Sequence, residues 1–185
     1  PDAIGENGAV TSSSKHASQI GIDVLENGGN AIDAAIAVGF ALSVTFPNAG
    51  NLGGGGFMVI RTSTGEVKTI DFREVAPQNA SRNMYLDEKG DVISGMSLYT
   101  AHASGVPGTV AGFEYAHEKF GTKSWNYLLR PSIQLATNGF KLSFRDAMYL
   151  NASRSFFLRD EESAKIFASQ DNYNVGDLFI QKDLA

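Results

Sequence analysis

The sequence predicts a layered, mixed α/β (α+β) fold, because extended segments alternate with helical segments along the chain. Residues 57–60 are an apolar run typical of a buried strand, and residues 63–66 form a turn before residues 67–73 return as the second strand of a hairpin. Residues 31–45 are apolar on nearly every side, which is typical of a buried helix. A chain of 185 residues with 43% hydrophobic residues is long enough to bury a core.

The first 45 residues predict a strand followed by two helices. Residues 8–13 are short, apolar and β-prone, and we interpret them as a strand of the core sheet. The helix that follows has its apolar residues at helical spacing and ends at the Asn-Gly-Gly sequence of residues 27–29. Asn30 is then expected to cap the second helix, with Asp33 stabilising the exposed amides of its first turn. A capping role accounts for Asp33 without a catalytic one.

Four consecutive glycines at residues 53–56 separate the second helix from the hairpin. Glycine weakens helices and strands and brings no side chain, so such a run indicates a need for backbone freedom or close approach. A phosphate-binding loop would open a helix and have a lysine nearby, whereas this run opens a strand. We therefore interpret the loop as structural support that lets a core strand approach the wall of a binding site.

Arg73 is the candidate binding residue of the hairpin. The two-residue period of a strand places Ile70 and Phe72 on one face and Asp71 and Arg73 on the other. A guanidinium held at a strand end, beside a backbone that allows close approach, is suited to binding a carboxylate through two parallel hydrogen bonds. The alternative is an ordinary ion pair with a nearby acid such as Asp71 or Glu74.

The second half of the chain predicts a surface excursion followed by helices. Residues 78–104 are polar and rich in turn-forming residues, and we assign them no role. The first helix after this excursion is expected to pack through a face that includes Val110 and Phe113. Pro131 is expected to interrupt the second helix and to open another one. The helical segments expected here are residues 109–120, 125–138 and 143–150.

Composition excludes several classes of function. The net charge of −5 and the lack of a basic run argue against a nucleic-acid surface. The absence of cysteine excludes disulfides and thiolate chemistry, and the spacing of the three histidines makes no metal site. No cofactor is predicted. The longest apolar stretch, residues 34–46, is too short to span a bilayer.

Four segments in fixed order resemble the gamma-glutamyltransferase family, also called gamma-glutamyltranspeptidases or glutathione hydrolases. They read GNAIDAAIA (29–37), PNAGNLGGGGFM (47–58), DFREVAP (71–77) and GVPGTVAG (105–112). The resemblance runs from about Gly8 to the last residue. It implies the αββα sandwich of the N-terminal-nucleophile hydrolases, of which residues 1–185 would be the N-terminal portion of a large subunit and a single incomplete domain.

The resemblance also implies a division of chemistry between two subunits. Family members cleave themselves into a large and a small subunit, and a threonine at the new N-terminus of the small subunit attacks the gamma-glutamyl amide of glutathione and related compounds. The glutamyl group then passes through an acyl-enzyme to water, amino acids or peptides. No threonine begins this chain, so no catalytic residue is expected in it. The expected partners are the remainder of the large subunit and the small subunit.

The resemblance assigns one binding residue to this chain. The arginine of the Asp-Phe-Arg-Glu motif binds the substrate's alpha-carboxylate in the family, and it corresponds to Arg73. Glu74 is expected to lie behind it and orient it. Because family members are exported, a periplasmic or secreted protein is expected, with its leader removed before Pro1.

Two other functions remain open at this point. A relative within the superfamily would be an acylase for a different acyl group, but an acyl group without an alpha-carboxylate would not need the arginine of the Asp-Phe-Arg-Glu motif. A non-catalytic binding or scaffold protein would keep the fold and lack the nucleophile.

Overall fold

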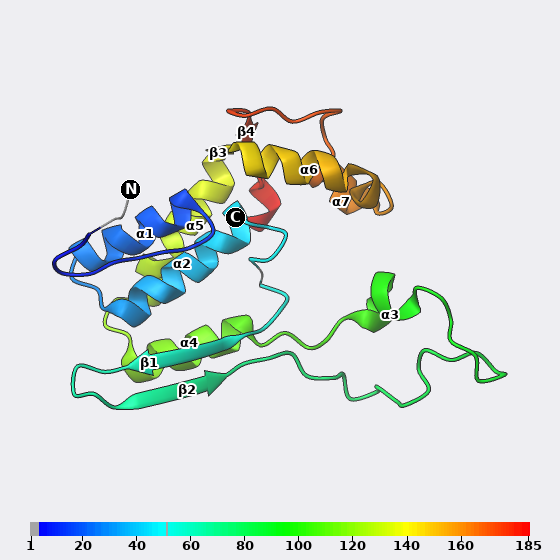
Figure 1. Ribbon diagram of the computed structural model, residues 1–185, viewed down its shortest axis with the longest axis horizontal. Coiled ribbons are helices and arrows are strands. Elements are labelled where there is room, and N and C mark those ends of the chain that lie inside the picture. The colour runs from blue at the N-terminus through cyan, green and yellow to red at the C-terminus, as the bar shows by residue number, and fades with distance from the viewer. Residues whose placement is uncertain (1–3, 51) are drawn as a thin grey trace. The chain divides into compact units, whose positions relative to one another are not determined.

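The structure is a computed structural model and describes residues 4–50 and 52–185. The chain divides into two compact units (Figure 1). Unit 1 combines the chain up to Gly50 with residues 121–185, and unit 2 is the segment between them, up to Phe120. Helices and strands occur in both units, which confirms the mixed class. The assignment of residues 1–185 to a single incomplete domain stays a prediction.

Unit 1 is built mainly from helices. Its elements are α1 (Lys15–Glu26), α2 (Ala31–Thr45), α5 (Trp125–Asn138), β3 (Phe140–Lys141), α6 (Phe144–Phe157), α7 (Glu161–Phe167), β4 (Leu178–Phe179) and the 3₁₀ turn η2 (Lys182–Leu184). No helix of the described residues is long and apolar enough to cross a membrane.

Helix α2 packs against both α1 and α5 (Figure 1). Most of its surface is buried, as the apolar sequence predicted, but a stripe that includes Ala35, Gly39 and Leu42 is exposed or only partly buried. Ser14 caps α1, and Asn30 and Asp33 form a reciprocal capping box that starts α2. The two helices approach closely at Gly21, where a Cβ atom would lie only 2.7 Å from the side chain of Val38. Local capping and one close contact thus fix the first helical pair.

Three expectations for unit 1 are wrong. Residues 8–13 form no strand; Val10 instead packs onto Gly21 of α1, because no neighbouring strand pairs with this segment in the described structure. Helix α5 runs through Pro131 without a break, since burial of one face against α2 outweighs the lost hydrogen bond. Helix α6 continues past Leu150 to Phe157.

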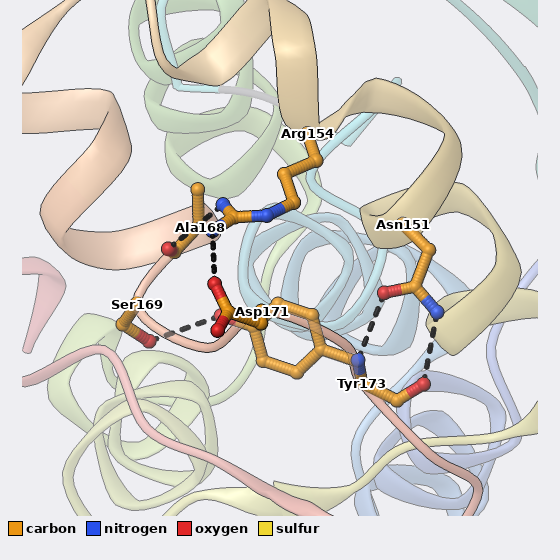
Figure 2. A network of polar contacts seen from close by, with 6 residues as sticks. All are labelled: Asn151, Arg154, Ala168, Ser169, Asp171 and Tyr173. Carbon is orange, nitrogen blue, oxygen red and sulfur yellow. Dashed lines mark hydrogen bonds and ion pairs between the residues drawn. The ribbon is translucent and has the colours of Figure 1, made fainter.

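A polar network holds the segment after α7 against α6 (Figure 2). The Asn151 side chain accepts from the backbone N–H of Tyr173 at 2.8 Å and donates to its carbonyl at 2.9 Å. Arg154 donates to the carbonyl of Ala168 and forms an ion pair with Asp171 at 2.8 Å. The phenol of Tyr173 is buried and within 3.0 Å of the Ser169 hydroxyl. These contacts place the segment beside the core formed by β3, β4 and α6.

Unit 2 is a hairpin with a helix beside it and a long excursion. Its elements are β1 (Phe57–Arg61), β2 (Val67–Asp71), α3 (Met96–Tyr99), the 3₁₀ turn η1 (Ala101–Ala103) and α4 (Thr109–Phe120). The strands are antiparallel, and the register pairs Phe57 with Asp71 and Arg61 with Val67. The turn between them includes Gly65 at φ 88°, a conformation that favours glycine. The hairpin and the excursion agree with the sequence (Figure 1).

The apolar residues of unit 2 are less buried than the sequence predicted. Phe57 and Val59 are 65% and 73% exposed, so β1 is buried on one face only. The packed face of α4 includes Phe113, as expected, but Val110 is 43% exposed. The other buried residues of α4 are small, among them Gly112. The ring of Phe72 lies directly against Gly112.

Candidate functional site

Arg73 lies just beyond the end of β2, in a backbone that is held by hydrogen bonds. Phe72 and Gly56 exchange two backbone hydrogen bonds of 3.0 and 3.4 Å, so the hairpin ladder continues one pair past the assigned strands. The carboxylate of Asp71 accepts a 3.0 Å hydrogen bond from the N–H of Arg73. The carboxylate of Asp71 therefore contacts the main chain of Arg73 and not its guanidinium, so this contact is not the side-chain ion pair given as the alternative.

The tetraglycine loop lies directly against the Arg73 backbone. A Cβ atom on Gly55 would be 2.5 Å from the carbonyl oxygen of Phe72, 2.7 Å from the nitrogen of Glu74 and 2.8 Å from the Cα of Arg73. Real Cβ atoms do not approach other atoms so closely. Only glycine therefore fits at position 55 without a shift of the main chain. This agrees with the expectation that the glycine loop allows close approach of the backbone.

A second glycine-containing segment, residues 105–108, encloses the same backbone from another direction. Val75 and Val106 exchange backbone hydrogen bonds of 2.8 and 3.2 Å. A Cβ atom on Gly105 would lie 2.9 Å from the Cβ of Glu74, and one on Gly108 would overlap the carbonyl of Phe72. The carbonyl of Gly54 accepts from the N–H groups at the start of α4, which joins the two glycine segments.

The side chain of Phe72 anchors the segment on its other face. Its ring meets Phe113 edge-on with the ring centroids 5.8 Å apart, and a Cβ atom on Gly112 would overlap its Cβ and ring atoms. A Cβ atom on Gly56 would be 3.1 Å from the ring. Three of the recognised sequence motifs thus meet around residues 72–74.

The guanidinium of Arg73, in contrast, faces solvent. Its side chain is 66% exposed, and the Glu74 side chain is 37% exposed. Arg73 Nε and Glu74 Oε2 form an ion pair at 3.8 Å, which is too long for a hydrogen bond, so the alternative of an ion pair with a nearby acid is present with Glu74. The guanidinium carbon is 5.9 Å from the centre of the Phe57 ring. The site therefore combines a fixed main chain with a cationic fork that a carboxylate ligand can reach.

Unit 1 contains an apolar cavity and a buried carboxylate that are not part of this site. An apolar cavity of about 270 Å³ in unit 1 has several aromatic side chains in its lining, among them Phe140, Phe157, Phe167 and Phe179. Asp33 is fully buried and caps α2, as predicted. Among residues 4–50 and 52–185, no three His, Cys, Asp or Glu side chains are grouped so as to hold a metal ion.

Comparison with known proteins shows where this fold belongs. The sequence profile described as Gamma-glutamyltranspeptidase matches residues 17–185. The Glutathione hydrolase proenzyme of Pseudomonas sp. (strain A14) is 50% identical over 97% of this chain, which covers 32% of that protein; the protein of the same description from Escherichia coli (strain K12) is 47% identical, with 97% and 31% covered. The crystal structure of Helicobacter pylori gamma-glutamyltranspeptidase superposes with a TM-score of 0.94 at 49% identity, covering 100% of this chain and 53% of that one.

The fold is therefore part of the N-terminal-nucleophile hydrolase fold. Within that class, the chain belongs to the gamma-glutamyltranspeptidase family. It spans about a third of the length of the curated relatives and about half of the crystallised chain.

Proposed function

We propose that the protein containing this chain cleaves gamma-glutamyl amides such as glutathione and transfers the glutamyl group to water, amino acids or peptides. In this proposal Arg73 binds the alpha-carboxylate of the glutamyl group, and the distal amide extends toward a threonine nucleophile supplied by a small subunit outside residues 1–185. The remainder of the large subunit and that small subunit are the partners. Periplasmic or secreted localisation is part of the same proposal.

The observation that carries the proposal is the contrast between the backbone and the side chain of Arg73. The main chain is enclosed by glycine segments, whereas the guanidinium is 66% exposed. The contact of Arg73 with Glu74 is one ion pair of 3.8 Å through Nε and not a bidentate hydrogen bond, so it does not occupy both arms of the guanidinium fork. The names of the similar proteins, glutathione hydrolase and gamma-glutamyltranspeptidase, support the substrate class.

Glu74 is proposed to orient Arg73 through the charge contact between them. Both side chains are partly exposed, so solvent screens this contact and its effect is small. Glu74 is thus a positioning residue, and Arg73 makes the substrate contact.

The test is steady-state kinetics of Arg73→Lys in the full-length, self-cleaved protein with a gamma-glutamyl anilide. Lysine keeps the charge but loses the planar fork, so KM is expected to rise about ten- to hundredfold, which corresponds to about 1.5 to 3 kcal/mol for a charged bidentate contact. Arg61→Lys, at the opposite end of the exposed hairpin face, is the matched control and should leave KM unchanged. Unchanged kinetics in Arg73→Lys would remove Arg73 from the site.

A further inference from the structure

We propose that Gly55 is a positioning residue for substrate binding: it fixes the main chain of Arg73 so that the guanidinium meets the carboxylate of the substrate in one orientation. This inference rests on the proposed function of Arg73. It assigns a separate role to one of four glycines that the sequence does not distinguish.

The register of the hairpin continues beyond the assigned strands. Phe57 pairs with Asp71, and Gly56 exchanges hydrogen bonds with Phe72. The same register places Gly55 opposite Arg73. Gly55 is thus the residue across the ladder from the proposed ligand-binding side chain.

Gly55 and Arg73 lie very close together. A methyl group on Gly55 would contact three main-chain atoms of residues 72–74 at 2.5 to 2.8 Å. Main-chain atoms cannot yield as the far end of a flexible side chain can, so the segment itself would have to move.

Residues 72–74 are also closely packed against residues 105–108. Gly105 and Gly108 approach residues 72–74 so closely that neither position has room for a Cβ atom, and Val75 is hydrogen bonded to Val106. A side chain at position 55 would therefore tilt the Arg73 main chain against a fixed support. Because binding by two parallel hydrogen bonds depends on orientation, a small tilt reduces affinity for the carboxylate.

The chain offers a matched control within the same loop. A Cβ atom on Gly53 would meet no atom within 4 Å, and Gly53 does not have a positive φ. Gly53→Ala and Gly55→Ala therefore make the same chemical change two residues apart, and both remove the same amount of backbone freedom. Only the second substitution places a methyl group against Arg73.

The experiment measures KM and kcat of both variants in the full-length, self-cleaved protein with a gamma-glutamyl anilide. We expect Gly55→Ala to raise KM about tenfold and to leave kcat within about twofold, whereas Gly53→Ala leaves both within about twofold. A general loss of folded enzyme would lower the amount of active protein and leave KM unchanged. Equal KM values for the two variants would overturn the proposal.

A double-mutant cycle then tests whether Gly55 acts through Arg73. In an Arg73→Lys background the oriented fork is already lost, so adding Gly55→Ala is expected to change KM by less than about twofold. A further tenfold rise would show that Gly55 acts independently of Arg73 and would overturn the inference. An Arg73→Lys variant that behaves like the wild type would instead contradict the proposed function, and the inference with it.

If Gly55→Ala yields no soluble, self-cleaved protein, Gly56→Ala decides the question. Its Cβ atom would meet only the ring of Phe72, at 3.1 Å, which demands a shift of a few tenths of an ångström. Positioning through residues 72–74 is supported if Gly56→Ala raises KM about twofold or more with kcat unchanged, and if the same substitution leaves KM unchanged in the Arg73→Lys background. An unchanged KM overturns it.

Discussion

The hydroxyl of Thr122 donates a 2.6 Å hydrogen bond to the carboxylate of Asp33, a residue 89 positions earlier in the chain. The backbone N–H groups of Thr122 and Lys123 donate to the same carboxylate at 3.0 and 3.2 Å, and the N–H of Asn30 donates at 2.9 Å. Asp33 therefore does more than start α2. It joins that helix to the segment that leads into α5.

Replacing Asp33 should weaken this junction more than loss of a helix cap alone. Asp33→Ala removes a buried carboxylate that accepts from four donor groups, so we expect the local opening free energy to fall by about 3 kcal/mol, compared with about 1 kcal/mol for a simple cap. Hydrogen exchange of the amides of Thr122 and Lys123 in the full-length protein measures it. Asp146→Ala removes the corresponding residue of the α6 capping box and is the control. An equal fall of the opening free energy at these two amides in both variants would contradict the role of Asp33 in joining α2 to the segment before α5.

The same carboxylate predicts a dependence of stability on acid. Burial by itself raises the pKa of Asp33, but hydrogen bonds from the side chain of Thr122 and from three backbone N–H groups together lower the pKa below its ordinary value of 3.8. The ionised form is thus favoured by folding. Its contribution to stability is fully present above about pH 4 and is lost as the pH falls through the lower, folded pKa. The thermal midpoint of the wild type should fall more on acidification from pH 5 to pH 3 than that of Asp33→Asn.

Asn151→Ala should release the segment that follows α7. The amide of Asn151 makes two hydrogen bonds, of 2.8 and 2.9 Å, to the main chain of Tyr173 (Figure 2). The Tyr173 carbonyl also accepts a longer hydrogen bond of 3.4 Å from Asn172. We expect faster hydrogen exchange in residues 168–177, corresponding to about 2 kcal/mol. Asn126→Ala on the exposed side of α5 is the control. Unchanged exchange in Asn151→Ala would show that the core alone holds the segment.

Glu74→Gln should have a small effect on kinetics. The 3.8 Å contact with Arg73 lies at a partly exposed site, where charge pairs contribute about 0 to 1 kcal/mol. KM for a gamma-glutamyl anilide is expected to rise at most about fivefold, and less at high salt. A loss as large as that of Arg73→Lys would show that Glu74 itself contacts the substrate.

Features encoded locally in the sequence were predicted correctly. Asn30 and Asp33 define the start of α2, and the turn at Gly65 defines the hairpin, because each depends on residues a few positions apart. The absent strand at residues 8–13 shows the limit of such reasoning, since β propensity produces no strand without a partner. The continuous α5 shows it as well, because tertiary packing overrode the preference of Pro131.

The candidate site was predictable in part for the same reason. Arg73 could be selected from the strand period and the motif, whereas the roles of individual glycines could not. Gly53 and Gly55 belong to the same run of four glycines, yet of these two only Gly55 lies against the Arg73 main chain. The partner of Asp33 was also hidden, because Thr122 is distant in the chain. Contacts of this kind depend on tertiary structure and leave no local pattern.

The central claim is that Arg73 recognises the alpha-carboxylate of the glutamyl group. The most direct measurement compares a gamma-glutamyl anilide with a 4-aminobutanoyl anilide, which lacks only that carboxylate, in the wild-type and Arg73→Lys full-length enzymes. We predict that Arg73→Lys lowers kcat/KM about ten- to hundredfold for the first substrate and less than about twofold for the second. An equal loss on both substrates would contradict carboxylate recognition by Arg73.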